Sequence, residues 1–229
     1  CIQAQLNNNP YTELVWSDEF DGEGIPDPDK WGYEVGYVRN GELQYHTEAR
    51  VENAFQKDGY LHLKAIYNDP IKDSDGNILN HKEGHITSAS IISKDKGDWR
   101  YGRFEIRAKV PGPNKGSWPA IWMMPTESAY GNWPHSGEID IMEHVGKDPN
   151  MVHTTLHSEL YNHMKGTQIT HFERFDDVFN TFHTYAVDWT EQSIRFYIDN
   201  KLFYEVYKGQ DGKVTTNEGW PFDKPYYLI

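Results

Sequence analysis

Alternation of apolar and polar residues predicts that most of this chain forms β-strands. In residues 103–110, four apolar side chains beginning at Phe104 stand at every second position, so they share one face of an extended segment. The same period occurs in residues 60–66. Only residues 172–182 are predicted to form a helical turn or two. The other predicted strands are residues 86–93, 118–124, 138–145, 151–158, 183–189, 193–199 and 202–207.

Short polar turns separate these strands, and many short strands at regular spacing are typical of a β-sandwich. We therefore expect an all-β, two-sheet antiparallel β-sandwich. No linker or internal repeat interrupts it, so residues 11–229 are predicted to be one domain after an N-terminal tail, residues 1–10. Residues 68–83 are polar and are predicted to be a surface loop. The turn pairs are Asp58-Gly59, Asp75-Gly76, Asp199-Asn200 and Asp211-Gly212.

Composition and charge exclude several classes of protein. Of 229 residues, 37% are hydrophobic and 14% aromatic, which is enough to bury a core. The 22 Lys and Arg residues against 35 Asp and Glu residues give a net charge of −13. Such a surface repels phosphate backbones and anionic lipid headgroups, which argues against nucleic acid or a membrane surface as a partner. No apolar run reaches the roughly 20 residues of a transmembrane helix.

The single cysteine, Cys1, excludes an intramolecular disulfide. A cysteine at a mature N-terminus followed by a polar stretch, here residues 3–9, is typical of a bacterial lipoprotein after signal cleavage. Two interpretations stay open: a lipid anchor at Cys1, or a boundary that happens to fall there. We expect an extracellular or cell-surface protein.

Candidate chemistry is concentrated in one strand, which carries Glu138, Asp140 and Glu143. In a regular strand Glu138 and Asp140 share a face, whereas Glu143 points to the opposite side. A one-residue β-bulge around Ile141-Met142 would return Glu143 to the shared face. The outer Cα atoms would then lie about 13 Å apart. Two glutamate side chains that lean together reduce this gap to the roughly 5–5.5 Å of retaining glycosidases.

These three acids suggest a division of labour. One glutamate must be ionised to attack a sugar carbon, and the other must hold a proton for the leaving oxygen. A middle carboxylate keeps their pKa values unequal. The alternative is a solvated acidic strand face, which the apolar and aromatic flanks disfavour.

Aromatic side chains surround the acidic strand. Trp118 and Trp122 are four residues apart and share a strand face, and Trp133 lies in the turn that precedes Glu138. Flat indole rings suit the C–H faces of sugars; for any one tryptophan alone a place in the core is the better explanation, but a same-face pair together with a tryptophan in a loop favours sugar binding. Asn40 and Arg103 could donate hydrogen bonds to sugar hydroxyls.

The chain resembles glycoside hydrolase family 16, and within it the laminarinases, which are endo-β-1,3-glucanases. The bulged acid motif is highly specific, and the resemblance covers nearly the whole chain. The residues that carry it are Gly137-Glu138-Ile139-Asp140-Ile141-Met142-Glu143, Trp118-Pro119-Ala120-Ile121-Trp122-Met123, Tyr101-Gly102-Arg103-Phe104-Glu105, Trp16-Ser17-Asp18-Glu19-Phe20, Thr155-Leu156-His157 and His183-Thr184-Tyr185-Ala186-Val187-Asp188-Trp189.

This resemblance implies a β-jelly-roll with a concave substrate cleft and retention of anomeric configuration. Glu138 matches the nucleophile, Asp140 the assisting carboxylate and Glu143 the general acid/base. It implies no cofactor for the chemistry but a structural calcium, to which Glu19 and Gly59 fit. The positions that match sugar-binding subsites are Asn40, Arg103, Trp118, Trp122, Trp133 and His157.

Several alternatives remain open at this point. The substrate is expected to be a laminarin-type β-1,3-glucan, but mixed-linkage glucan or an algal galactan fits the same family. A non-catalytic glucan-binding protein is less favoured, because both outer glutamates are present. Relatives continue beyond the segment that ends at Ile229, so we expect a fragment that lacks its final strands. We expect a monomer.

Overall fold

The computed structural model describes residues 11–229, so Cys1, the predicted anchor position, lies outside the described residues. These residues form two compact units. We call residues 11–14 and 98–228 the sandwich unit, and residues 15–97 with Ile229 the N-terminal unit. Two compact units can still fold together as one domain, so the prediction of one domain over residues 11–229 stays a prediction.

The first sheet of the sandwich unit has six strands, and each is antiparallel to its neighbours. The strand nearest the C-terminus is inserted between β9 and β7 rather than added at an edge. In spatial order the strands are β12 (Ile169–Arg174), β11 (Met151–His157), β10 (Glu138–Glu143), β9 (Ala120–Pro125), β16 (Tyr226–Leu228) and β7 (Asp98–Trp99).

The second sheet of this unit has four antiparallel strands in the order β15 (Lys201–Tyr207), β14 (Ser193–Ile198), β13 (His183–Trp189) and β8 (Gly102–Ala108). Asp199 and Asn200 join β14 to β15 with φ values of 50° and 63°. Positive φ at both central residues is the requirement of a type I′ hairpin turn, which the sequence pair predicted. A short 3₁₀ helix, η2 (Gln210–Gly212), follows β15.

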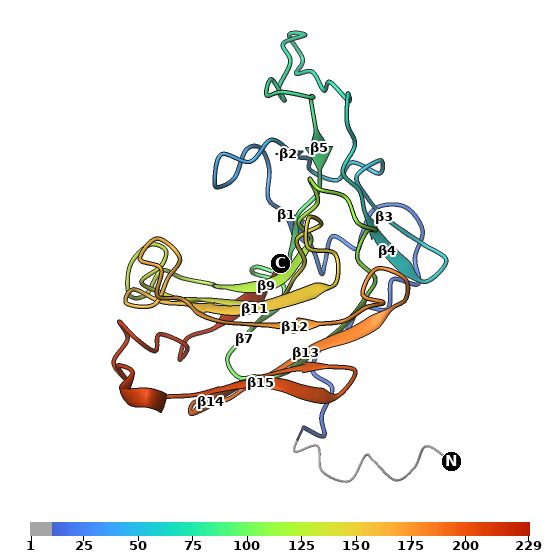
Figure 1. Cartoon of the computed structure of the whole chain (residues 1–229). Helices are drawn as coiled ribbons and strands as arrows, with labels where there is room; N and C mark the ends of the chain where they lie inside the picture. Colours follow the sequence, from blue (N-terminus) through green and yellow to red (C-terminus); the bar gives the residue numbers. More distant parts are fainter. Residues whose placement is uncertain (1–10) are drawn as a thin grey trace, which may run out of the picture. The chain divides into compact units, whose positions relative to one another are not determined.

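The two sheets pack through their apolar faces, and Figure 1 shows them as two layers. Trp189 is fully buried, and its ring lies 5.1 Å from that of Tyr226 in an edge-to-face contact. Its indole N–H donates to the carbonyl of Phe222 at 3.0 Å, so its polar atom is satisfied. At the edge, His171 of β12 stacks on Tyr204 of β15 at 4.8 Å. The fold is the predicted all-β antiparallel sandwich.

The N-terminal unit contains three strand pairs: β1 (Gly32–Tyr33) with β6 (Ile91–Ile92), β2 (Tyr45–His46) with β5 (Thr87–Ser88), and β3 (Ala54–Lys57) with β4 (Tyr60–Leu63). The β2–β5 pair is parallel, and the other two are antiparallel. Asn53 and Thr87 are fully buried and joined by a hydrogen bond of 2.9 Å. Asp58 and Gly59, with φ values of 54° and 76°, form the turn between β3 and β4.

The structure corrects some strand predictions. Residues 86–93 form two short strands, β5 and β6, and residues 172–174 complete β12 instead of a helix. The sequence signal for β12 is weak because this edge strand is mostly exposed, with charged residues at its end. In β4, Leu63 remains 49% exposed. No helix within residues 11–229 combines the length and apolar composition needed to traverse a lipid bilayer.

Candidate active site

A β-bulge in β10 decides which side chains the strand presents. Against β9, Asp140 pairs with Trp122 and Met142 with Ile121, so two steps along β10 oppose one step along β9. The pairing of β10 with β11 shows the same extra residue between Asp140 and Glu143. The predicted bulge at Ile141-Met142 is therefore confirmed. Both of these side chains are 1% exposed, so the extra residue is absorbed by the core.

A buried hydroxyl helps to hold this irregular backbone. Thr154 of β11 is fully buried, and its Oγ1 donates to the carbonyl oxygen of Asp140 at 2.6 Å. A bulge disrupts the ladder locally, and buried carbonyl groups need a partner. Thr154 supplies that partner from the core side of the sheet, next to the start of the bulge.

The turn before β10 fixes the first acid. Gly137 has φ 88°, and a Cβ there would lie 2.2 Å from the hydroxyl oxygen of Tyr226. That hydroxyl donates to the carbonyl of Ser136 at 2.7 Å, which ties the turn to β16. The same turn carries Trp133, whose indole N–H donates to the carboxylate of Glu138. Glycine is required here by both backbone conformation and close packing.

Glu138, Asp140 and His157 form the centre of the cluster. One potential ligand or proton-carrying atom from each lies within 4.8 Å of the others. The His157 Nε2 atom is 3.4 Å from Asp140 Oδ2 and 4.0 Å from Glu138 Oε1. Asp140 is 3% exposed, and its Oδ2 accepts no hydrogen bond among the described residues. Such a group holds a proton more readily than a solvated carboxylate does.

Burial dominates the electrostatics of this centre. Desolvation, followed by the neighbouring charge of Asp140, raises the pKa of Glu138 well above its ordinary value. Desolvation, followed by the charge of Glu143, does the same to the pKa of Asp140. Burial lowers the pKa of His157, although the charges of Glu138 and Glu143 oppose this shift. Mutually close carboxylates in such surroundings share protons rather than ionise together.

Glu143 lies on the same face and has its own hydrogen-bond donor. The indole N–H of Trp118 donates to Glu143 Oε1 at 3.0 Å. Burial raises the pKa of Glu143, and this donor partly offsets the rise because it favours the ionised form. The charges of His157 and His163 act in the same direction as Trp118. Each outer glutamate thus receives one tryptophan N–H.

The structure brings most of the predicted sugar ligands to this face. Trp122 pairs directly with Asp140, and His157 pairs with Glu138 on the other side. Trp118 remains 65% exposed beside Glu143. Sequence reasoning missed His163, whose ring lies 5.0 Å from that of Trp133 and 5.2 Å from that of His157. It stands in an exposed loop after β11, where no periodic pattern marks it.

Arg103 is not brought to this cluster. It lies on β8 of the four-stranded sheet, next to Phe104, which packs toward Trp189. Its guanidinium donates to Asp188 at 2.8 Å and to Asn200 at 2.9 Å, so its donors are engaged within that sheet. The structure therefore places Arg103 in the sheet that does not carry the acids, and its role as a sugar ligand stays a prediction.

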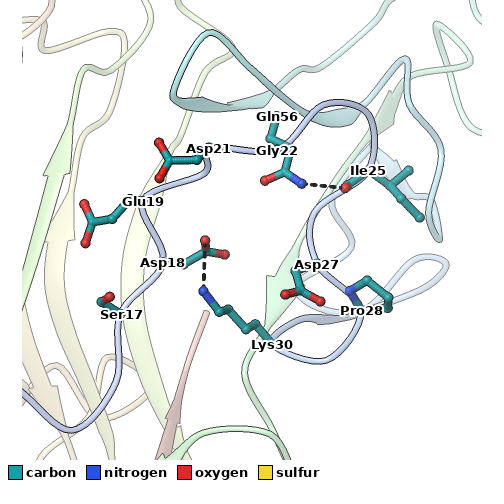
Figure 2. Close-up of a pocket in the computed structure, with 10 residues that line it drawn as sticks. All are labelled: Ser17, Asp18, Glu19, Asp21, Gly22, Ile25, Asp27, Pro28, Lys30 and Gln56. Atoms are coloured by element: carbon teal, nitrogen blue, oxygen red, sulfur yellow. Dashed lines mark hydrogen bonds and ion pairs between the residues drawn. The ribbon is translucent and has the colours of Figure 1, made fainter.

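The remaining predicted residues lie in the N-terminal unit. Asn40 occupies an exposed turn with φ 52°, and its role as a sugar ligand stays a prediction. Glu19 lines a hollow of about 420 Å³, which Figure 2 shows together with Asp18, Asp21 and Asp27.

Within this hollow, Asp18 is paired with Lys30 at 3.3 Å and accepts from the indole of Trp31 at 2.7 Å. Glu19 and Asp21 direct their carboxylates to the other side of the loop (Figure 2). Such oxygens suit calcium, which prefers hard ligands. Gly59 lies in the β3–β4 turn and does not line the hollow.

The geometry on the acid-bearing face defines a limited chemistry. Two glutamates flank a deeply buried aspartate on one sheet face, and both carry raised pKa values. Because close carboxylates in such surroundings do not all ionise together, one glutamate can hold a proton while the other is ionised. Exposed indole beside these acids offers a flat apolar platform. This arrangement fits acid-assisted substitution at a sugar carbon.

Comparisons with known proteins agree with that chemistry. The sequence model of the glycosyl hydrolases family 16 matches residues 45–229. A β-glucanase of Rhodothermus marinus is 45% identical over 96% of this chain and 74% of that protein. A glucan endo-1,3-β-glucosidase A1 of Niallia circulans is 38% identical over 94% of this chain and 33% of that protein. The X-ray structure of the laminarinase from Rhodothermus marinus superposes with a TM-score of 0.85 at 44% identity, covering 95% of this chain and 84% of that one.

Proposed function

The chain belongs to family 16 of the glycosyl hydrolases, and from that premise we propose that it hydrolyses internal β-1,3-glucosidic bonds of laminarin-type glucans with retention of configuration. The names of its relatives support the substrate, since they include a β-glucanase and a laminarinase. A neutral polyglucan also needs no basic cleft, which agrees with a net charge of −13.

The observation that carries this proposal is the bulge in β10. Without the extra residue, Glu143 would point to the side opposite Glu138. With it, Glu143 reaches the indole of Trp118 while Glu138 reaches the indole of Trp133. Retaining glycosidases need two carboxyl groups that act on a single glycosidic bond. A bulge beside an active site is a recognised way to re-aim a side chain.

The first half of the reaction forms a covalent intermediate. The ionised Glu138 attacks the anomeric carbon, and a carboxylate–sugar ester bond forms as the glycosidic C–O bond breaks. Glu143 gives its proton to the departing oxygen, so that the leaving sugar departs as an alcohol. The N–H of Trp133 stabilises the ionised form of Glu138. Burial raises the pKa of both glutamates, and that of Glu138 further, so the assignment of the proton to Glu143 rests on the match of its position to the family motif and not on the pKa shifts.

The second half reverses these roles. The ionised Glu143 removes a proton from water, the resulting hydroxyl attacks the same carbon, and Glu138 leaves as a carboxylate. Two inversions at one carbon retain its configuration. Asp140 and His157 are positioning residues that hold Glu138 through their charges and shared protons. The term positioning residue refers here to the contacts of these two side chains with Glu138. The predicted contact of His157 with the sugar is a separate proposal.

Replacement of Glu138 by glutamine tests the proposal. E138Q should lose laminarin hydrolysis in a reducing-sugar assay, while its thermal unfolding and its retardation by laminarin in affinity electrophoresis remain measurable. Glu105 offers a matched control, since it is an exposed glutamate on β8 of the other sheet. E105Q should keep wild-type turnover. Full activity of E138Q would refute the assignment of the nucleophile.

Substrate choice within the family is tested by the same assay. Laminarin, lichenan and agarose present β-1,3-glucan, mixed-linkage glucan and galactan respectively. We expect the highest kcat/KM on laminarin. Preferential release of sugar from lichenan or agarose would shift the proposal to those substrates, and binding without release from any of them would favour a glucan-binding protein.

We also propose a structural calcium bound near Glu19; the further ligand predicted at Gly59 would be its carbonyl, which lies outside the hollow, in the β3–β4 turn. The support is the acidic loop itself: Glu19 and Asp21 direct their carboxylates to the same side of it (Figure 2), and calcium binds through oxygen ligands. The ion takes no part in the reaction. Metal analysis of the purified protein and a fall in Tm on treatment with a chelator test the proposal; an unchanged Tm with no bound calcium would contradict it.

The substrate also suggests where the enzyme acts. Polymeric glucan does not cross a lipid bilayer, so we propose action outside the cell or at its surface. Fractionation of cells that produce the protein, followed by the reducing-sugar assay on each fraction, tests this location. Activity confined to the cytoplasmic fraction would contradict it.

A further inference from the structure

An exposed aromatic residue outside the acid cluster lies on the same sheet face. Phe172 of β12 is 59% exposed. Its neighbours in sequence face the interior: His171 stacks on Tyr204 of the opposite sheet, and Ile169 is 7% exposed. Because side chains alternate along a strand, Phe172 points to the opposite side, which is the face that carries the acids.

Strand register connects Phe172 to the proposed general acid. Glu143 of β10 pairs with His153 of β11, and His153 pairs with Phe172 of β12. The rings of His153 and Phe172 lie 5.9 Å apart. With neighbouring strands about 4.8 Å apart, Phe172 stands roughly 10 Å from Glu143 along the direction perpendicular to the strands. A sugar chain that crosses the strands above Glu143 would reach it.

The same row continues on the other side of Glu143. Ala120 of β9 pairs with Glu143, and Trp118, two residues earlier, donates its indole N–H to that carboxylate. Trp118 is 65% exposed. Two exposed aromatic side chains therefore flank the acid, one toward β9 and one on β12, with His153 between the acid and Phe172. One exposed aromatic side chain would need no explanation, but two on the same strand face in one row with the acid form a surface on which sugar rings can stack.

We propose that Phe172 forms a distal subsite that stacks against a glucosyl ring of a long substrate, roughly 10 Å from Glu143 across the strands. This inference rests on the proposed hydrolysis of β-1,3-glucan. It adds that the glucan lies across the strands, along the row that runs from Trp118 past Glu143 to Phe172. The occupant is a neutral pyranose, because its C–H faces match an apolar ring and the protein rings next to Phe172 are those of His153 and His171.

The experiment compares substrates of different length. For each variant, kcat/KM is measured on laminarin and on laminaritriose, and the ratio of the two values is taken. The variants are F172A, F172W and the control L202A, which removes a 43% exposed leucine from β15 of the other sheet. Thermal unfolding and light scattering are recorded for all of them.

For F172A the ratio should fall about 2- to 12-fold, which is the range expected for loss of an aromatic stacking contact. F172W should restore most of the ratio, and L202A should leave it at the wild-type value. An unchanged ratio in F172A, or equal losses on both substrates, would overturn the proposal. The proposal would also be overturned if light scattering showed a dimer for the wild type and a monomer for F172A while the ratio stayed unchanged. In that case a second copy of the protein, and not a sugar, would cover Phe172. If the wild-type enzyme cleaves neither substrate, the proposed function fails rather than the subsite.

Discussion

Replacement of Thr154 by valine would test how strongly the bulge in β10 depends on one hydrogen bond. Thr154 is fully buried, and its hydroxyl donates to the carbonyl of Asp140 at 2.6 Å. Valine keeps the β-branched shape that suits a strand but removes the donor. The carbonyl of Asp140 would then be buried without that partner, next to the residues that turn Glu143 toward the acid face.

The structure sets the expected magnitude. Leaving a buried acceptor unsatisfied lowers the free energy of unfolding by about 1–3 kcal/mol. For a protein of this size, each kcal/mol corresponds to a Tm shift of roughly 2–4 °C. A bulge that relaxes also displaces Glu143 relative to Glu138, and a misplacement of about 1 Å reduces catalysis by up to about 10²-fold. We therefore expect T154V to lower Tm and kcat together, with a smaller change in KM.

The assay combines thermal unfolding with steady-state kinetics on laminarin for T154V, T154S and T184V. T154S keeps the hydroxyl and should stay near wild type in both measurements. T184V changes a half-buried threonine on β13 of the other sheet and should alter the free energy of unfolding by no more than about 0.5 kcal/mol. A lower Tm with unchanged kcat in T154V would refute the link between this hydrogen bond and the placement of Glu143.

Two further predictions concern the acids themselves. Trp118→Phe removes a donor that favours ionised Glu143, so the pKa of Glu143 should rise and the alkaline limb of the kcat/KM–pH profile should move to higher pH; movement to lower pH would contradict the assignment. Asp140→Asn should lower kcat but raise Tm at pH 7. Burial raises the pKa of Asp140 in the folded state, so wild-type stability falls as pH rises from the unfolded value through the folded one, and asparagine has no proton to lose. A lower Tm for D140N at pH 7 would refute this reading.

Local sequence patterns predicted most of the longer strands of the sandwich but missed one exposed edge strand and very short strands. The strand at residues 183–189 coincides with β13 (His183–Trp189) because it lies at the centre of a sheet, where hydrophobic residues are required. β12 and β16 were missed, since an exposed edge strand and a three-residue strand carry little periodic signal. The turn at Asp199-Asn200 was predicted because those residue types adopt positive φ at small cost.

The candidate site was predicted unevenly for a similar reason. Spacing alone indicated that Glu138, Asp140 and Glu143 share a face only if the strand contains one residue more than its neighbours at this point. The bulge in β10 confirms this. Neither Thr154 nor His163 carries a local signal, because both contact β10 or its neighbours through chain segments that are distant in sequence. Arg103 was predicted to bind sugar from its residue type and the resemblance, but only the structure shows that it lies in the other sheet, paired with Asp188.

The sequence by itself determined the β-rich architecture, the acidic strand and its need for a bulge, since strand periodicity and turn chemistry are properties of neighbouring residues. Only the tertiary structure decided which tryptophan donates its N–H to which glutamate and how deeply Asp140 is buried. It also decided that Phe172 lies in the same row as Glu143, two strands away. These features depend on strand order and register. Both are set by packing of the two sheets across the core, and no single segment of the chain encodes that packing.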